Sequence, residues 1–209
     1  MAADNVRAVL RDYYDAQLRA AGPTPRGADW DSAESQELRF AQLLRSLPLI
    51  GDRTLLDYGC GYGALCDFMR ARGLGAHYTG FDISAAMITE AKRLHASDPH
   101  CTFTSLPNTL ASADYVVASG IFNVRLAVDD DEWNRYVQEE VLRMAELANV
   151  GIAFGVLSTY SDPEKQRDYL YYADPLAWFD FCKRHIGAAV VLLHDDPVFE
   201  FTLGATKGW

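Results

Sequence analysis

Two acidic residues and three closely spaced glycines are the residues of this sequence whose types and spacing best suit chemistry. Asp57 stands two positions before Gly59, which is followed by Gly61 and Gly63, and Asp82 lies further along the chain. Glycines at alternate positions permit a sharp backbone turn and let a ligand approach where a Cβ would collide. The free N–H groups of such a turn, and of a helix that begins after it, would face that ligand. The pattern therefore predicts a ligand-binding turn with carboxylates nearby.

The glycines fit two interpretations. As G-x-G-x-x-A, the residues Gly59, Gly61 and Ala64 satisfy the dinucleotide fingerprint, in which a helix N-terminus holds a pyrophosphate. As acid-x-G-x-G-x-G, the same stretch also accounts for Asp57 and Gly63. A carboxylate at position 57 suits a ligand that carries an amino group and repels a pyrophosphate. The second interpretation is therefore favoured, and a nicotinamide or flavin enzyme is the alternative.

The stretch from Leu55 to Leu65, which contains these glycines, closely resembles motif I of the class I S-adenosylmethionine (SAM)-dependent methyltransferases. A weaker resemblance continues to the C-terminus. It implies SAM as the cofactor and a Rossmann-like α/β fold: a seven-stranded, mostly parallel sheet with a C-terminal antiparallel strand and an N-terminal helical lid. Residues 1–209 are predicted to form a single domain, with the lid over 1–50 and the sheet core over 51–209.

Strands and helices are predicted to alternate along the chain. Apolar runs bounded by turn residues indicate the strands, and apolar residues at helical spacing indicate the helices. The segment 31–34 is interpreted as a capping box with Asp31 as the N-cap. The expected strands are 53–58, 76–82, 100–104, 114–120, 150–157, 188–193 and 198–206. The expected helices are 6–20, 31–47, 64–72, 84–97, 175–186 and one that begins at the acids 129–132.

Asp82 is the predicted ribose-binding residue. It ends the second expected strand, which a doubly wound fold places beside the glycine turn, and the resembled family carries its ribose-binding acid at this position. A carboxylate there can accept hydrogen bonds from both ribose hydroxyls. The alternative is that Asp82 caps the next helix, although Ser84 can fill that role.

The resemblance assigns further cofactor contacts to residues after the later strands. Ile83 is expected to cover a face of the adenine, with Met87 as the alternative. Ser105 follows the third strand, where many family members carry an acid for the adenine edge, so adenine recognition would rest on backbone N–H groups here. Ser119, at the end of the fourth strand, is expected near the methionine portion. The predicted cofactor-binding residues are Asp57, Gly59, Gly61, Gly63, Asp82, Ile83, Ser105 and Ser119.

Candidates for catalysis and acceptor binding follow the fourth and fifth strands, at the sheet edge where ligands bind in α/β proteins. Tyr160 is the first catalytic candidate, because a tyrosine ring can stabilise a sulfonium and its hydroxyl can orient or deprotonate an acceptor. Asn123 is the second, and Arg125 and Tyr172 are predicted to bind the substrate. Trp30 is a further substrate-binding candidate, from the lid. The alternative for each is a packing or loop-stabilising role.

Charge and composition argue against several other classes of protein. The net charge of -10 disfavours nucleic acid as a partner, since backbone phosphates require basic patches. No apolar run is long enough to span a bilayer. The four cysteines contain no C-x-x-C pair, so they are predicted to be reduced thiols in a cytoplasmic protein. No metal site is predicted, because the acids 129–132 would diverge on a helix N-terminus. The oligomeric state does not follow from the sequence.

Together these features predict methyl transfer from SAM to a small-molecule acceptor. The N-P-P-Y sequence that amide- and base-methylating family members often carry after the fourth strand is absent. One alternative is a non-methylating enzyme of the same fold, such as an azetidine-2-carboxylate synthase that cyclises SAM and releases methylthioadenosine. Another is a cofactor-binding protein without enzymatic activity.

Overall fold

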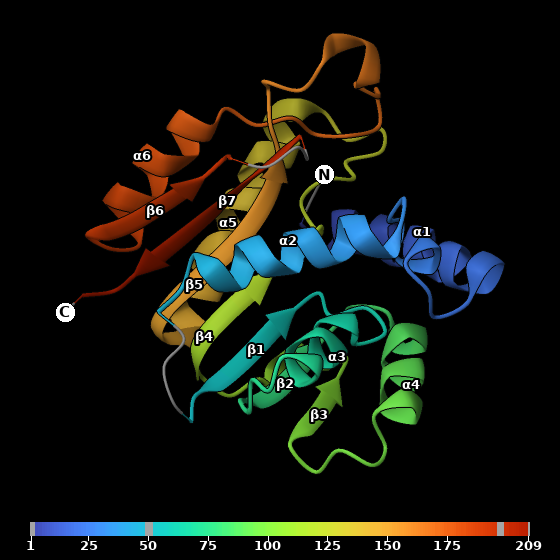
Figure 1. Cartoon of the computed structure of the whole chain (residues 1–209). Helices are drawn as coiled ribbons and strands as arrows, with labels where there is room; N and C mark the ends of the chain where they lie inside the picture. The colour runs from blue at the N-terminus through green and yellow to red at the C-terminus, as the bar shows by residue number, and fades with distance from the viewer. Residues whose placement is uncertain (1–2, 49–51, 196–198, 209) are drawn as a thin grey trace.

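The protein is built on a seven-stranded sheet with helices on both faces, as Figure 1 shows. A computed structural model describes residues 3–48, 52–195 and 199–208. The strand order is β3-β2-β1-β4-β5-β7-β6. The strands are β1 (Thr54–Tyr58), β2 (His77–Phe81), β3 (Cys101–Thr104), β4 (Ala113–Ala118), β5 (Ala148–Leu157), β6 (Ala189–Leu193) and β7 (Glu200–Thr206). The helices are α1 (Ala3–Ala21), α2 (Ala33–Arg45), α3 (Ala64–Ala71), α4 (Ala85–Leu94), α5 (Asp130–Leu147) and α6 (Pro175–His185), with short 3-10 turns η1 (Arg26–Ala28), η2 (Pro107–Thr109) and η3 (Pro163–Lys165).

One strand of the sheet runs against the others. β1 is parallel to β2 and β4, and the pairs β2–β3 and β4–β5 are parallel as well. β7 is antiparallel to both of its neighbours, β5 and β6. The predicted fold class is therefore confirmed, and the observed strands begin and end within two residues of the predicted bounds. The predicted start of the last strand, residue 198, lies outside the described residues.

Alternation along the strands sends side chains into two hydrophobic cores, one on each face of the sheet. On one face, Leu56 and Tyr58 of β1 pack in a core with residues of α1, α5 and α6. On the other face, Leu55 packs in a core with residues of α2, α3 and α4. Val116 and Val117 of β4 are both fully buried, as expected of a central strand covered on two sides. The turn after β1 is therefore held between two packed layers.

The two N-terminal helices complete these cores as well as covering the sheet edge. Val6 of α1 is buried in the first core and Phe40 of α2 in the second. An ion pair ties α2 to the last strand, with Arg39 Nε 2.9 Å from Glu200 Oε2. The boundary predicted between lid and sheet core, at residues 50 and 51, lies outside the described residues.

The N-cap of α2 is Ser32, which corrects the prediction of Asp31. Ser32 Oγ accepts a hydrogen bond from Ser35 N at 3.1 Å. A cap side chain must reach the N–H two or three positions further along the chain. Because the helix begins at Ala33, Ser32 has this reach.

Cys66 and Cys101 are joined by a disulfide, which corrects the prediction of four reduced thiols. The two cysteines are separated by 35 residues in the sequence. They meet because the chain returns through β2 and α4 to place the start of β3 beside α3. Cysteine spacing alone carries no sign of a contact made by such a crossover. The prediction holds for Cys60 and Cys182, which are free.

Candidate functional site

A tight turn built on three glycines joins β1 to α3. Gly59, Gly61 and Gly63 have φ angles of 91°, 54° and 90°, a region that glycine adopts without steric cost. Gly59 N donates to Phe81 O at 2.7 Å, which fixes the turn to the end of β2. A Cβ at Gly61 would meet no atom within 4 Å, whereas one at Gly63 would lie 2.6 Å from His95 Nε2. Gly61 is therefore open to a ligand, and Gly63 is required for packing.

A cavity of about 420 Å³ lies beside this turn, between the carboxyl ends of the central strands and helices α1 and α5. Its size lies in the range typical of small-molecule and cofactor sites. The predicted residues that line it are Trp30, Asp57, Gly59, Gly61, Asp82, Ile83, Ser105 and Ser119. The structure therefore brings together the predicted cofactor-binding residues, apart from Gly63, and one of the predicted substrate-binding residues.

Asp82 faces the glycine turn from the end of β2. Its Oδ2 accepts from Gly61 N at 2.9 Å and its Oδ1 from Ser84 N at 2.8 Å. Since each carboxylate oxygen has a further lone pair, these bonds orient the group and leave acceptors for a ligand. Ser84 itself caps α4, with Oγ accepting from Met87 N at 3.0 Å. Burial raises the pKa of Asp82 to about 6, with a smaller contribution from the Asp15 carboxylate, against the lowering effect of the two backbone N–H groups.

Asp57 is buried beneath the same turn and is only 3% exposed. The Tyr78 hydroxyl donates to its Oδ2 at 2.5 Å. Burial raises the pKa of Asp57 to about 7; the Tyr78 hydrogen bond opposes this shift, and the neighbouring Asp82 carboxylate adds to it. Negative charge in this cavity is therefore unfavourable unless a cation or hydrogen-bond donors compensate it. The arrangement suits a ligand that presents positive charge towards Asp57 and hydroxyl groups towards Asp82.

Trp30 closes one side of the cavity. Its ring packs over Gly120, where a Cβ would lie 2.5 Å from Trp30 Cζ2. The Arg39 guanidinium lies 4.9 Å from the centre of the same ring. Tyr62, at the edge of the glycine turn, donates through its hydroxyl to Gln36 Oε1 at 3.2 Å. The segment before α2 is therefore packed on the turn that follows β4, and α2 itself is bonded to the glycine turn.

The two catalytic candidates lie outside the lining of the cavity. Tyr160 is 69% exposed on the segment after β5, with its ring centre 5.9 Å from that of His194. Asn123 is buried, and its amide donates to Glu200 Oε2 and accepts from Leu157 N, both at 3.1 Å. Catalytic roles for Tyr160 and Asn123 stay predictions.

Arg125 and Tyr172, the remaining substrate-binding candidates, also lie outside the cavity lining. Arg125 pairs with Asp130 at 2.9 Å and donates through Nη1 to Val128 O at 2.9 Å. The Tyr172 hydroxyl accepts from Arg167 N at 3.0 Å. These contacts order the two segments that follow β4 and β5. The substrate-binding roles of both residues stay predictions.

A polar cluster at the far end of the cavity is absent from the predicted set of residues. Glu140 of α5 is buried, accepts from the Tyr58 hydroxyl at 2.6 Å and pairs with Arg7 of α1. Tyr136 and Arg143 line the same cavity. One feature of the sequence could have indicated this cluster. Glu140 lies one helical turn after Tyr136 on the apolar face of α5, where a charged residue needs a partner.

Comparison with known proteins supports the resemblance found in the sequence. A family model described as a methyltransferase domain matches residues 55–145. The protein named methyltransferase Rv1506c, from Mycobacterium tuberculosis (strain ATCC 25618 / H37Rv), is 44% identical to this chain over 151 residues. The match covers 72% of this chain and 91% of that relative.

Solved structures share the fold at low sequence identity. Magnesium protoporphyrin IX methyltransferase (ChlM) from Synechocystis PCC 6803 with bound SAM gives a TM-score of 0.63 at 17% identity, over 96% of both chains. The N-methyltransferase NodS from Bradyrhizobium japonicum WM9, in complex with S-adenosyl-l-homocysteine, gives 0.63 at 18% identity, over 94% of this chain and 97% of its own. Three observations agree: the family match, the 44% identical relative, and the glycine turn flanked by two acids. This chain therefore belongs to the class I SAM-dependent methyltransferases and uses SAM as its cofactor.

Proposed function

We propose that this protein transfers the methyl group of SAM to a small-molecule acceptor. The observation that carries the proposal is the placement of Asp57 and Asp82 beside an open glycine turn in one cavity. A cationic nucleoside offers positive charge to one carboxylate and ribose hydroxyls to the other. A pyrophosphate in the same place would be repelled by both.

The contribution of the chain to this reaction is binding and orientation. SAM supplies an electrophilic methyl group on a positively charged sulfur. Asp82 would hold the ribose and Asp57 would compensate the positive charge, while Ile83 and Ser105 would border the adenine and Ser119 the methionine portion. Holding two reactants in line can lower a barrier by roughly 7 to 11 kcal/mol, so the reaction does not require a dedicated base for every acceptor.

The proposal includes the class of acceptor and the place of action. A small-molecule acceptor agrees with the net charge of -10, which disfavours a nucleic acid. Within the described ranges, the helices lack the combination of length and apolarity that a bilayer crossing needs. We place the protein in the cytoplasm as part of the same proposal. Acceptor binding by Trp30, Arg125 and Tyr172, and catalysis by Asn123 and Tyr160, belong to it as well.

The products distinguish this function from other uses of SAM. The purified protein is incubated with SAM alone and with SAM plus a metabolite extract, and the products are identified by mass spectrometry. We expect S-adenosylhomocysteine and a methylated metabolite only when the extract is present. Methylthioadenosine formed from SAM alone would contradict methyl transfer.

Cofactor affinity is expected to increase as the pH rises from about 5.5 to about 8, by about 10- to 100-fold. The pKa values of about 7 for Asp57 and about 6 for Asp82 leave both acids largely protonated at the lower pH. A cationic ligand favours the ionised carboxylates, so binding near neutral pH should release protons. Calorimetry in buffers of different ionisation enthalpy measures this release directly. Proton uptake, or an affinity that falls with pH, would show that the cavity does not bind the cation through these acids.

Replacing Tyr160 by Phe is expected to lower turnover by about 10- to 100-fold if its hydroxyl acts on the acceptor. The thermal stability should not change, because the side chain is 69% exposed. Turnover is measured as S-adenosylhomocysteine formed with the identified acceptor. Tyr169→Phe is the matched control, since Tyr169 is an exposed tyrosine of the same segment. Equal turnover in Tyr160→Phe and the unaltered protein would remove Tyr160 from the proposal.

A further inference from the structure

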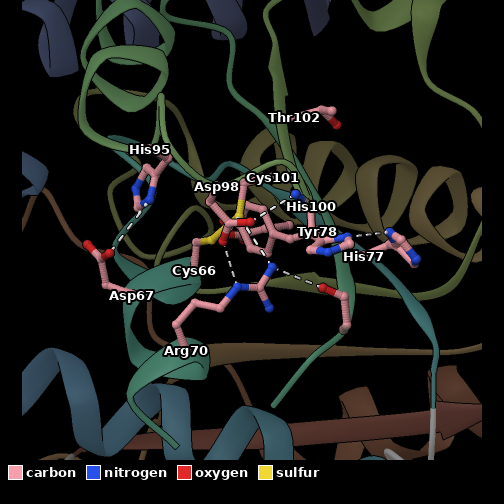
Figure 2. The surroundings of a disulfide bond; sticks show 12 residues. Cys66, Asp67, Arg70, His77, Tyr78, His95, Asp98, His100, Cys101 and Thr102 are labelled. Atoms are coloured by element: carbon pink, nitrogen blue, oxygen red, sulfur yellow. Dashed lines mark hydrogen bonds and ion pairs between the residues drawn. A yellow bond between two sulfur atoms is a disulfide. The ribbon is translucent and has the colours of Figure 1, made fainter. Parts of the chain in front are cut away.

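A pair of cysteines outside the cavity stands in surroundings that favour oxidation chemistry. Cys66 lies in the first turn of α3 and Cys101 at the start of β3, and a disulfide joins them. Figure 2 shows this bond with Arg70 and Asp98 beside it. Cys66 is completely buried, whereas Cys101 is partly exposed. The two sulfurs therefore differ in their access to solvent.

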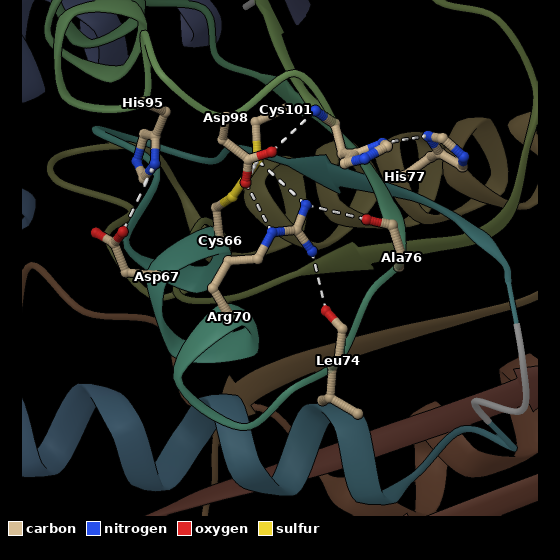
Figure 3. A network of polar contacts seen from close by, with 10 residues as sticks. Cys66, Asp67, Arg70, Leu74, Ala76, His77, His95, Asp98 and Cys101 are labelled. Atoms are coloured by element: carbon tan, nitrogen blue, oxygen red, sulfur yellow. Dashed lines mark hydrogen bonds and ion pairs between the residues drawn. A yellow bond between two sulfur atoms is a disulfide. The ribbon is translucent and has the colours of Figure 1, made fainter.

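Arg70 holds a positive charge against the more accessible sulfur. Its Nη2 lies 3.4 Å from Cys101 Sγ, and its Nε donates to Asp98 Oδ2 at 2.7 Å. The same guanidinium donates to the carbonyls of Leu74 and Ala76, at 2.9 and 3.1 Å (Figure 3). Three acceptors thus fix its position. A fixed cation next to a cysteine stabilises the thiolate, which is the nucleophilic form.

Asp98 completes the cluster as a hydrogen-bond acceptor. Its Oδ2 lies 3.2 Å from Cys101 Sγ, and its Oδ1 accepts from His100 N at 2.8 Å. The hydrogen bond from Arg70, followed by that from His100 N, holds the pKa of Asp98 below its ordinary value. The carboxylate is therefore ionised at neutral pH and can accept a hydrogen bond from the thiol of a reduced Cys101.

The other two cysteines provide an internal contrast. Cys60 and Cys182 are free and buried. Burial, followed by the charges of Asp57 and Asp82, raises the pKa of the Cys60 thiol well above its ordinary value. Burial alone raises the pKa of the Cys182 thiol to about 12. Both should remain protonated and unreactive under conditions in which Cys101 reacts.

We propose that Cys66 and Cys101 form a redox-active dithiol that hydroperoxides oxidise reversibly to the disulfide. In a reducing cytoplasm the pair would rest as two thiols, and the disulfide is its oxidised state. Cys101 is the attacking cysteine, because it is reachable and lies beside Arg70. Cys66 is the resolving cysteine, because it is shielded from solvent and within bonding distance of Cys101.

The reaction takes place in two steps. The Cys101 thiolate attacks one oxygen of the hydroperoxide, so that an S–O bond forms, the O–O bond breaks and an alcohol leaves after gaining a proton. The Cys66 thiol then attacks the sulfenic acid, so that the S–S bond forms, the S–O bond breaks and water leaves with the Cys66 proton. The two thiols together lose two electrons and two protons, and the hydroperoxide is reduced to one alcohol and one water.

A metal site is the rival explanation of the same cluster. Ligand atoms of Cys66, Asp98 and Cys101 lie within 4.8 Å of one another. However, the Arg70 guanidinium is bonded to Asp98 and lies against Cys101, where it would repel a dication. The fixed cation therefore favours a thiolate over a metal ion.

The disulfide leaves the cofactor cavity open. Cys66 N donates to Gly63 O at 3.0 Å, which places the bond immediately behind the glycine turn. The cavity and its two acids are intact in this oxidised state. We therefore expect oxidation to stabilise the fold while SAM binding is retained.

The test uses the full-length protein, reduced and then treated with hydrogen peroxide under native conditions. We expect an intact mass lower by two hydrogen atoms, a linked Cys66–Cys101 peptide, and a melting temperature raised by about 5 to 12 °C. In Cys66→Ser, dimedone should label a sulfenic acid at Cys101. In Cys101→Ser, Cys66 should remain unlabelled. Cys60→Ser and Cys182→Ser are the matched controls and should oxidise like the unaltered protein.

The role of Arg70 has a separate readout. Arg70→Gln should slow the reaction with peroxide by about tenfold, whereas Arg70→Lys, which keeps the charge, should slow it less. Absence of the linked peptide after excess peroxide would overturn the proposal, and so would prior reaction of Cys60 or Cys182. A further outcome would favour the metal site over the redox-active dithiol: one equivalent of zinc that stays bound to the reduced protein after a wash with chelator. None of these outcomes depends on methyl transfer.

Discussion

Replacing Asp82 by Ala is expected to weaken SAM binding by about 100- to 10,000-fold, because the loss of two charge-assisted hydrogen bonds to a ribose costs about 3 to 6 kcal/mol. The same change removes the acceptor of Gly61 N, which Asp82 Oδ2 holds at 2.9 Å. The turn would then lose the bond that aims it at the cofactor. Isothermal titration calorimetry with SAM measures the effect.

The size of the loss should depend on the position of the acid. Asp82→Asn, which keeps one carbonyl oxygen as an acceptor, should fall between Asp82→Ala and the unaltered protein. Asp180→Ala is the matched control, because Asp180 is an exposed acid on α6 that pairs with Arg184 of the same helix. Unchanged SAM affinity in Asp82→Ala would refute the ribose-binding role and leave the carboxylate as a brace for the turn.

Asp57→Asn should bind SAM about 10- to 100-fold more weakly, and yet the protein without cofactor should become more stable at about pH 8. The folded-state pKa of Asp57 is about 7, raised from its ordinary value of 3.8 chiefly by burial. Between pH 3.8 and about pH 7, the folded state therefore keeps a proton that the unfolded state has lost. Stability from this group is present at low pH and is lost as the pH rises through about 7.

At about pH 8 the ionised Asp57 destabilises the cofactor-free protein by about 2 to 4 kcal/mol, and Asn removes that cost while it can still accept from the Tyr78 hydroxyl. We expect the melting temperature of Asp57→Asn to exceed that of the unaltered protein by about 4 to 12 °C at this pH. The difference should disappear near pH 4, where both side chains are neutral. A variant that is less stable at every pH would show that the buried charge is already compensated within the protein.

Much of the fold can be predicted from the sequence, because the local preferences of each segment agree with its place in the tertiary structure. The apolar runs that become β1, β2 and β4 are bounded by turn residues, and the two faces of each strand meet separate cores. The error at the N-cap of α2 is of the smallest kind: Asp31 and Ser32 are both good caps, and the choice depends on where the first turn closes. The glycine turn is predicted because a positive φ at Gly59, Gly61 and Gly63 leaves a mark in the sequence.

Contacts between distant segments of the chain are not indicated by any local sequence pattern. Nothing in the sequence around Glu140 shows that Arg7, from the first helix, will meet it in the same cavity. Nothing around Cys66 shows that Cys101 will return beside it. Residues that bind by backbone geometry are therefore predictable from the sequence, whereas residues that act through a partner from another segment require the three-dimensional structure.

The ion pair between Arg39 and Glu200 also constrains how the chain can be made. The two residues are separated by 161 positions, so α2 leaves the ribosome long before β7 exists. Since domains fold during synthesis from the N-terminus onward, the Arg39 charge has to remain solvated until β7 has been made, whereas Phe40 beside it packs against Phe68 of α3 much earlier. A nascent chain halted before β7 would therefore leave Arg39 without its Glu200 partner and would expose that side of α2 to chaperones.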